Sequence, residues 1–143
     1  MLAGDDDPPR TQTEIWWIAF ENSPTLGWWR VFTRPGFEHC WAFRQVGERA
    51  TLVLNPHLHR IEIELAPYDP WEVIDHAKAK GCRVLVVKRQ VSEYDPARHG
   101  RVGRGVFLTC ASLLSYLIGA NFSWQCTPYQ LFRTALKHGA EEV

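Results

Sequence analysis

Three strand-like segments follow one another between residues 37 and 65, and this close succession restricts the fold more than any other feature of the chain. The segments are FEHCWAFRQV (37–46), ATLVLNP (50–56) and HRIEIEL (59–65), all rich in the β-branched, aromatic and apolar residues that favour strands. The third alternates strictly, so that Ile61, Ile63 and Leu65 share one face. Short connections join antiparallel neighbours, and a turn near Gly47 suits the first of them. The region therefore predicts an antiparallel meander.

The flanking sequence adds two strands and three helices. TEIWWIAF (13–20) and CRVLVVKRQV (82–91) are predicted strands, and helices are predicted over 69–81, 108–119 and 127–139. The first and third helices have sequence signals at both ends: Asp69, Pro70 and Gly81 for the first, and Thr127, Pro128, Gln130 and Gly139 for the third. The aromatic stretch 23–36 is predicted to be an irregular connection, and 92–105 a polar loop. We expect an α+β fold, an antiparallel β-sheet with packed helices.

Length and charge narrow the classes of protein to consider. The 143 residues predict a single domain over 13–143, preceded by a flexible acidic and proline-rich arm at 1–12. With 16 basic and 16 acidic residues the net charge is zero, which disfavours nucleic acid as a partner. The chain has neither an apolar run long enough for a membrane span nor the basic and apolar start of a signal peptide. We therefore expect cytoplasmic synthesis without a signal peptide, and no cofactor.

Four widely spaced cysteines, Cys40, Cys82, Cys110 and Cys126, form no CxxC pair. This spacing disfavours zinc-ribbon and thioredoxin motifs, and we interpret the four as reduced thiols.

The position of Cys110 is compatible with two interpretations, a buried core thiol and a catalytic nucleophile. In a helix it shares an apolar face with Leu113, Leu114 and Leu117, a pattern typical of a buried thiol. It also lies in the first turn, directly after a loop rich in glycine and arginine. Free N–H groups and the helix dipole at that position stabilise a thiolate and can bind an oxyanion. Both interpretations stay open at this point.

His39 is the best candidate for the base that a thiol nucleophile needs. It lies in the middle of the first meander strand, on the face of Phe37, Trp41 and Phe43. A histidine on an aromatic face is costly unless its ring nitrogens have partners, so His39 is either a satisfied core residue or part of a site.

Asn55, at the end of the next strand, is the best candidate for orienting His39. A three-residue loop at 46–48 would place Asn55 directly opposite His39, whereas a two-residue turn would place it opposite Cys40. A slip of two residues would bring His57 to His39 instead. The sequence leaves this register open.

Cys40 is expected in the core, because neighbouring strand residues point to opposite faces of a sheet. The same divergence disfavours a metal site built from His39, Cys40 and Cys110, and we expect no metal.

The segments GFEHCWAF, LVLNP, LTCASLLSYLIG and TPYQLF together resemble the permuted NlpC/P60-type thiol hydrolases of the papain-like fold, in particular small phage-associated members. In those proteins the histidine strand comes first, a polar residue follows on the next strand, and the cysteine helix comes late. The resemblance covers about residues 35–136. It implies a circularly permuted papain-like fold with Cys110 as nucleophile, His39 as base and Asn55 as the group that holds the imidazole.

The resemblance also implies an activity, that of a cysteine peptidase or amidase of phage or prophage origin. Its substrates would be amide bonds such as those of peptidoglycan peptides in the cell wall, reached by way of a virion or by lysis. Transfer of an acyl group would use the same three residues. The alternative is a catalytically silent virion structural or assembly protein with the same fold, whose partners are other virion proteins.

Overall fold

The computed structural model describes residues 12–23, 27–57, 60–91, 109–117 and 127–143. The predicted loop at 92–105 lies outside these ranges, as does the predicted arm at 1–12 except for Gln12, which begins the first strand.

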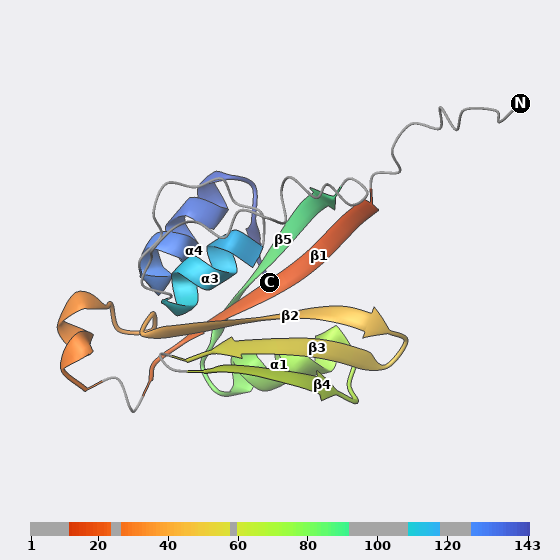
Figure 1. Ribbon diagram of the computed structural model, residues 1–143, viewed down its shortest axis with the longest axis horizontal. Coiled ribbons are helices and arrows are strands. Elements are labelled where there is room, and N and C mark those ends of the chain that lie inside the picture. The colour runs from red at the N-terminus through yellow and green to blue at the C-terminus, as the bar shows by residue number, and fades with distance from the viewer. Residues whose placement is uncertain (1–11, 24–26, 58–59, 92–108, 118–126) are drawn as a thin grey trace, which may run out of the picture.

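The strands form one six-stranded antiparallel sheet (Figure 1) in the order β4-β3-β2-β1-β5-β6. The strand bounds are β1 Gln12–Glu21, β2 His39–Gly47, β3 Ala50–Pro56, β4 Ile61–Ala66, β5 Arg83–Val91 and β6 Glu141–Glu142. Strands β2, β3 and β4 pair in sequence order, which confirms the predicted meander. The sheet continues through β1, which pairs with both β2 and β5. This pairing places the start of β2 within the sheet, between β1 and β3.

Three described helices pack on the sheet: α1 Pro70–Ala79, α3 Cys110–Leu117 and α4 Pro128–Lys137. Asp69 and Thr127 cap α1 and α4 through capping boxes, as the sequence predicts. The glycines that follow these two helices, Gly81 and Gly139, have φ of +84° and +95°, a backbone conformation that favours glycine.

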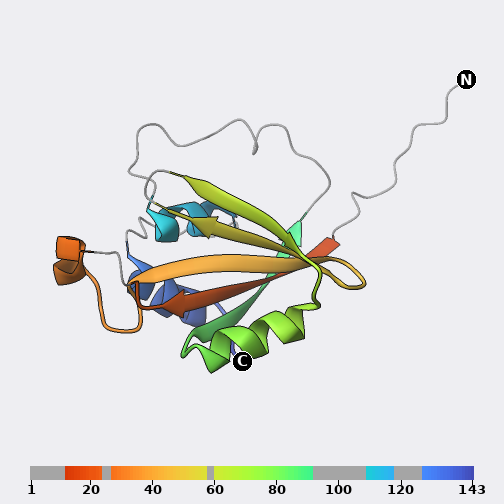
Figure 2. The same cartoon turned by 90° about the horizontal axis from the view of Figure 1, so that it is seen from below.

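The helices cover opposite faces of the sheet. One core cluster joins β1, β2 and β5 to α3 and α4, and it contains Ile18, Phe20, Cys40, Leu85, Leu114, Leu131 and Phe132 among others. The second joins the same strands to α1 and contains Trp17, Ala19, Phe43, Ile74, Ala77, Cys82 and Val84. Figure 2 shows α1 on one side of the sheet and α3 on the other. Alternate residues of β1 and β2 therefore face different helices.

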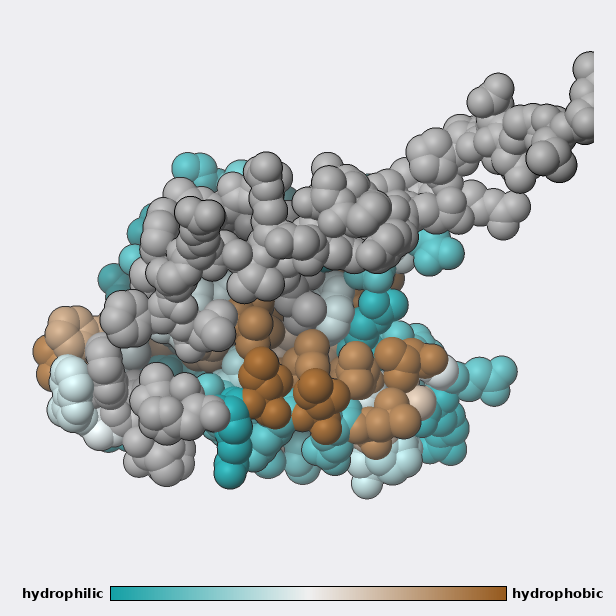
Figure 3. Space-filling model, viewed as in Figure 1, coloured by the Kyte–Doolittle hydropathy of each residue, from teal (hydrophilic) through white to brown (hydrophobic). Residues whose placement is uncertain are grey.

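Strand β4 shows how far periodicity alone determines burial. Ile61, Ile63 and Leu65 do share one face, but their side chains are 51%, 68% and 64% exposed. Figure 3 shows apolar residues gathered on this open part of the front face. The three residues share a face, as the alternation predicts, but the core cluster that α3 and α4 cover lies over β1, β2 and β5.

The stretch 23–36 contains a 3-10 helix, η1 Gly27–Phe32, which stands off from the sheet in Figures 1 and 2. Within the described ranges, no helix has the length and apolar character needed to cross a membrane. The architecture is α+β, as expected from the sequence.

Candidate active site

Cys110 is the first residue of α3, two positions later than the predicted helix start at 108. Thr109 explains the shift, because it caps the helix: its Oγ1 accepts a hydrogen bond from the Ser112 N–H at 3.1 Å. Its carbonyl oxygen accepts the first intrahelical bond, from the Leu113 N–H at 3.1 Å. The first N–H groups of a helix have no carbonyl partner within it, and those of Cys110 and Ala111 are such groups. The thiol therefore lies at the positive end of the helix dipole.

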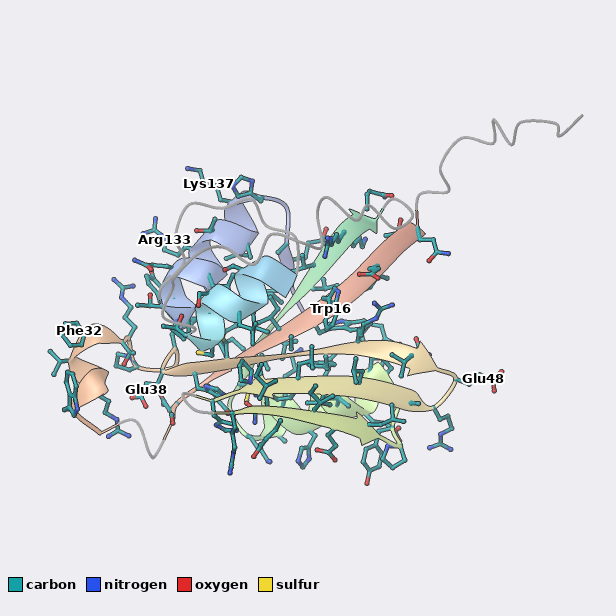
Figure 4. The ribbon with its side chains drawn as sticks, viewed as in Figure 1. Trp16, Phe32, Glu38, Glu48, Arg133 and Lys137 are labelled. Carbon is teal, nitrogen blue, oxygen red and sulfur yellow. The ribbon has the colours of Figure 1, made fainter. Side chains whose placement is uncertain are left out.

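His39 is the first residue of β2 and lies at the end of the strand that α3 contacts. Figure 4 labels the preceding residue, Glu38, at this end of the strand. His39 is paired with Glu21 of the neighbouring strand β1. The Cys110 side chain lies close enough to the His39 ring to act on it as a hydrogen-bond partner and as a charge, and both effects raise the pKa of His39. The structure thus brings together the predicted nucleophile and the predicted base.

Asn55, on β3, holds the other side of the imidazole. Its Oδ1 lies 2.6 Å from His39 Nε2. An amide oxygen can only accept, so Nε2 carries a proton and donates it. Nδ1 is then the nitrogen left to face the Cys110 thiol. All three predicted site residues therefore form one connected chain, Cys110–His39–Asn55.

The register between β2 and β3 differs from both loop geometries that the sequence suggests. Ala42 pairs with Leu54, and the register shifts between Gln45 and Gly47 at an irregularity near the turn. Continued to the end of the strand, this register sets His57 opposite His39 and Asn55 opposite Trp41, two residues farther along. Asn55 therefore reaches His39 diagonally across the strands, a distance that long side chains can span.

His57, the other candidate for the third residue, lies beside His39. Its ring stacks on that of His39 with centroids 5.6 Å apart and an interplanar angle of 13°. Its Nε2 lies 3.0 Å from a carboxylate oxygen of Glu62, on the exposed side of the strand pair. Of the two candidates for the third residue, Asn55 is therefore the one hydrogen-bonded to His39.

The charges of the site favour a thiolate beside an imidazolium. The pKa of Cys110 is lowered to about 5, first by a hydrogen bond with the Cys40 side chain, against the opposing effect of burial. The hydrogen bond and positive charge of His39 lower it further, and so does a backbone hydrogen bond from Cys40. The pKa of His39 is raised: burial lowers it, but the hydrogen bonds to Cys110 and Asn55 and the Cys110 charge outweigh burial. The two shifts act in the same sense, because each favours the thiolate–imidazolium form of the pair over the neutral form.

Cys40 is in the core, as predicted, with no exposed surface. It does not point away from the site, however, because its side chain and its backbone N–H both contact the Cys110 sulfur. Burial raises the pKa of the Cys40 thiol well above its ordinary range, and the Cys110 charge raises it further. Cys40 is therefore the protonated donor to Cys110. His39 and Cys40 are neighbours on β2, and both act on Cys110 at the start of α3.

Two further contributors to the site were not identified from the sequence. Thr109 places Cys110 at the helix start. The sequence signal for this was Thr109 itself, because threonine is a preferred N-cap residue and its side chain accepts a hydrogen bond from the N–H three residues later, here that of Ser112. Glu21 pairs with His39 across β1 and β2, and its charge helps to raise the pKa of His39. The pairing of β1 with β2 was not predicted, so Glu21 could not have been placed beside His39.

Among the residues that the structure describes, no cluster of histidine, cysteine, aspartate or glutamate side chains could hold a metal ion. Comparisons with protein-family models, with curated proteins and with solved structures found no match to this chain.

Proposed function

We propose that the protein is a cysteine hydrolase that cleaves amide bonds through Cys110, His39 and Asn55. One observation carries the proposal: His39 is hydrogen-bonded to Asn55, and its ring interacts with a thiol at a helix N-terminus whose pKa is lowered to about 5. This is the nucleophile, base and orienting group that covalent catalysis by cysteine requires. A buried thiol that serves packing alone has a raised pKa, as Cys82 illustrates, where burial first raises the pKa to about 11.

The reaction follows from the protonation states. The Cys110 thiolate attacks the carbonyl carbon of the amide, and the N–H groups at the start of α3 stabilise the oxyanion that forms. The His39 imidazolium donates its Nδ1 proton to the leaving amine, and a thioester of Cys110 remains. Neutral His39 then removes a proton from a water molecule, which attacks the thioester and releases the acid. Asn55 keeps the ring in the orientation that both proton transfers need.

The order of the elements supports a more specific proposal, membership of the permuted papain-like hydrolases of NlpC/P60 type. In this chain the histidine strand β2 precedes the strand of the polar residue, β3, and the cysteine helix α3 follows both. Peptides and peptidoglycan peptides are the substrates this proposal favours, and a phage or prophage origin accords with it.

The test is amide hydrolysis by the purified protein. A panel of peptides and purified peptidoglycan is incubated with the wild type, and new amino groups are quantified. Cys110→Ala is expected to lower the rate by about 10³-fold or more, because the covalent intermediate can no longer form. Mass spectrometry of the wild type is expected to show an acyl group on Cys110.

Cys82→Ala is the matched control, because Cys82 belongs to the cluster on the other face of the sheet. It is expected to keep the wild-type rate. Release of amines that is equally fast in Cys110→Ala would refute the proposal. So would a complete absence of hydrolysis across the panel, which would favour the silent virion protein.

A further inference from the structure

The proposed hydrolysis makes no use of the Cys40 sulfur, and yet this sulfur lies against the nucleophile. Cys40, on β2, is a buried member of the core cluster against which Cys110, on α3, packs, and the Cys40 side chain lies close enough to act on the Cys110 thiol. Cys40 has no exposed surface, whereas Cys110 is partly exposed. We propose that Cys40 is the resolving thiol of a reversible redox switch, which forms a disulfide with Cys110 after a peroxide has oxidised Cys110.

The difference between the two thiols assigns their roles. An oxidant-sensing cysteine is a thiolate that small molecules can reach, and it stands beside a second thiol. Cys110 meets the first two conditions and Cys40 supplies the third. Cys40 itself is shielded by burial and stays protonated, so a peroxide reacts at Cys110 first.

The chemistry balances in two steps. The Cys110 thiolate attacks one oxygen of hydrogen peroxide, the O–O bond breaks, and Cys110 sulfenic acid and hydroxide form. The Cys40 sulfur then attacks the sulfenic sulfur, and the S–O bond breaks. The departing hydroxyl takes up the Cys40 proton and leaves as water. The peroxide has accepted two electrons from the two thiols, and one disulfide has formed.

Among the described cysteines only Cys40 is placed for this role. Cys82 lies in the cluster on the α1 face of the sheet, and its sulfur is directed at a carboxylate oxygen of Glu21, 3.5 Å away. Three cysteines, Cys40, Cys82 and Cys110, are free thiols in the structure, which therefore corresponds to the reduced state of the switch.

The consequence is protection of the nucleophile together with loss of its reactivity. In the disulfide the Cys110 sulfur can attack neither an amide nor a second peroxide, so oxidation to the irreversible sulfinic acid is avoided. Reduction by a dithiol returns both cysteines to the state seen in the structure. The inference takes from the proposed function only that Cys110 is a reactive thiolate.

The experiment treats the full chain with a small excess of hydrogen peroxide and follows its mass. The wild type is expected to lose two hydrogen atoms, and peptide mapping at acid pH is expected to show a Cys40–Cys110 link. Dithiothreitol should then restore alkylation of Cys110. In Cys40→Ala and Cys40→Ser, Cys110 should instead gain two or three oxygen atoms, with loss of the recovery by dithiothreitol. Cys82→Ala should behave as the wild type.

The wild-type peptide map decides the matter even if the Cys40 variants fold poorly. Direct conversion of wild-type Cys110 to sulfinic acid, or a link from Cys110 to Cys126 or to a second chain, would overturn the inference. Because the readout is a mass, it is independent of turnover. A chain that forms this disulfide but hydrolyses no amide would support the switch and reject the proposed hydrolase, and the opposite pair of results would do the reverse.

Discussion

The pH at which Cys110 becomes reactive is the most direct measure of the site, and His39→Ala is the perturbation that tests it. The pKa of Cys110 is about 5 in the intact site, against about 8.5 for a free cysteine. At about pH 6 roughly nine tenths of Cys110 is then thiolate, whereas a free thiol is ionised to only about 0.3%, a ratio of about 300.

The rate of alkylation does not rise by the same factor. Nucleophilicity falls as the thiol pKa falls, with a Brønsted coefficient of about 0.4–0.5, which over this interval costs roughly 40-fold. Cys110 should therefore react only about eightfold faster than a free thiol near pH 6, and more slowly above about pH 7. The midpoint of the pH profile is for this reason the quantity to measure, and the absolute rate is not.

In the assay the protein is treated with iodoacetamide across a pH series, and labelling of Cys110 is followed by peptide mass spectrometry. The wild-type midpoint is expected near pH 5. Removing the imidazolium should raise the midpoint by roughly 1–3 pH units, the usual effect of an opposite charge at this range. The midpoint should stay below that of a buried unpaired thiol, because the hydrogen bonds from Cys40 remain.

His76→Ala is the matched control, since His76 lies on the exposed side of α1 and should leave the midpoint unchanged. Cys82 should remain unlabelled over most of the range, because its pKa is raised to about 11, first by burial. A wild-type midpoint near pH 8.5, or a midpoint indifferent to His39→Ala, would refute the thiolate–imidazolium pair.

Three further predictions concern the positioning of the same groups. Asn55→Ala should lower the hydrolysis rate by about tenfold to a hundredfold, because His39 is then no longer held in its orientation. His57→Ala should change the rate less than about fivefold. Equal effects of the two substitutions in steady-state kinetics would contradict the assignment of Asn55. Thr109→Ala should lower the free energy of unfolding by about 1 kcal/mol, measured by urea unfolding, because the helix cap is lost. Under conditions where the variant is folded, Cys110 should be less reactive than in the wild type. An unchanged midpoint of unfolding would argue against the cap. The pH profile of kcat/KM should be bell-shaped. Activity should rise as Cys110 ionises near pH 5, because its pKa is lowered, and should fall at higher pH as His39, whose pKa is raised, loses the proton it donates. A profile without an acid limb near pH 5 would contradict this.

Local elements of the fold were predictable because each has its own signal. The predicted strand at 50–56 coincides with β3, and the capping residues Asp69 and Thr127 begin α1 and α4 as expected. Strand β6, Glu141–Glu142, was not predicted, because two charged residues carry no strand pattern. It is held by pairing with β5 and by the contact of Glu142 with the Arg83 guanidinium at 2.7 Å, neither of which is visible in local sequence.

The candidate site was predictable in its members and not in its geometry. Cys110, His39 and Asn55 could be chosen by residue type and by position in their elements. Their approach depends on how far β2 and β3 slide past each other, and a bulge near the turn changes that register by one residue without a strong sequence signal. The register places His57, and not Asn55, directly opposite His39. Asn55 forms its hydrogen bond with His39 because its side chain spans the diagonal between the strands.

Cys40, which the sequence assigned only to the core, has the largest effect on the pKa of Cys110. Strand alternation assigned it to the core, and its burial agrees, but the contact with Cys110 makes it the first cause of the low Cys110 pKa. The same contact places a second sulfur within reach of an oxidised nucleophile. Serine at this position keeps a hydrogen-bond donor and loses the sulfur, whereas alanine loses both. Stabilisation of the thiolate therefore depends on a donor at residue 40, while the redox switch depends on sulfur there, and the two Cys40 variants separate these roles: only alanine should move the pH midpoint of Cys110, and both should abolish the disulfide.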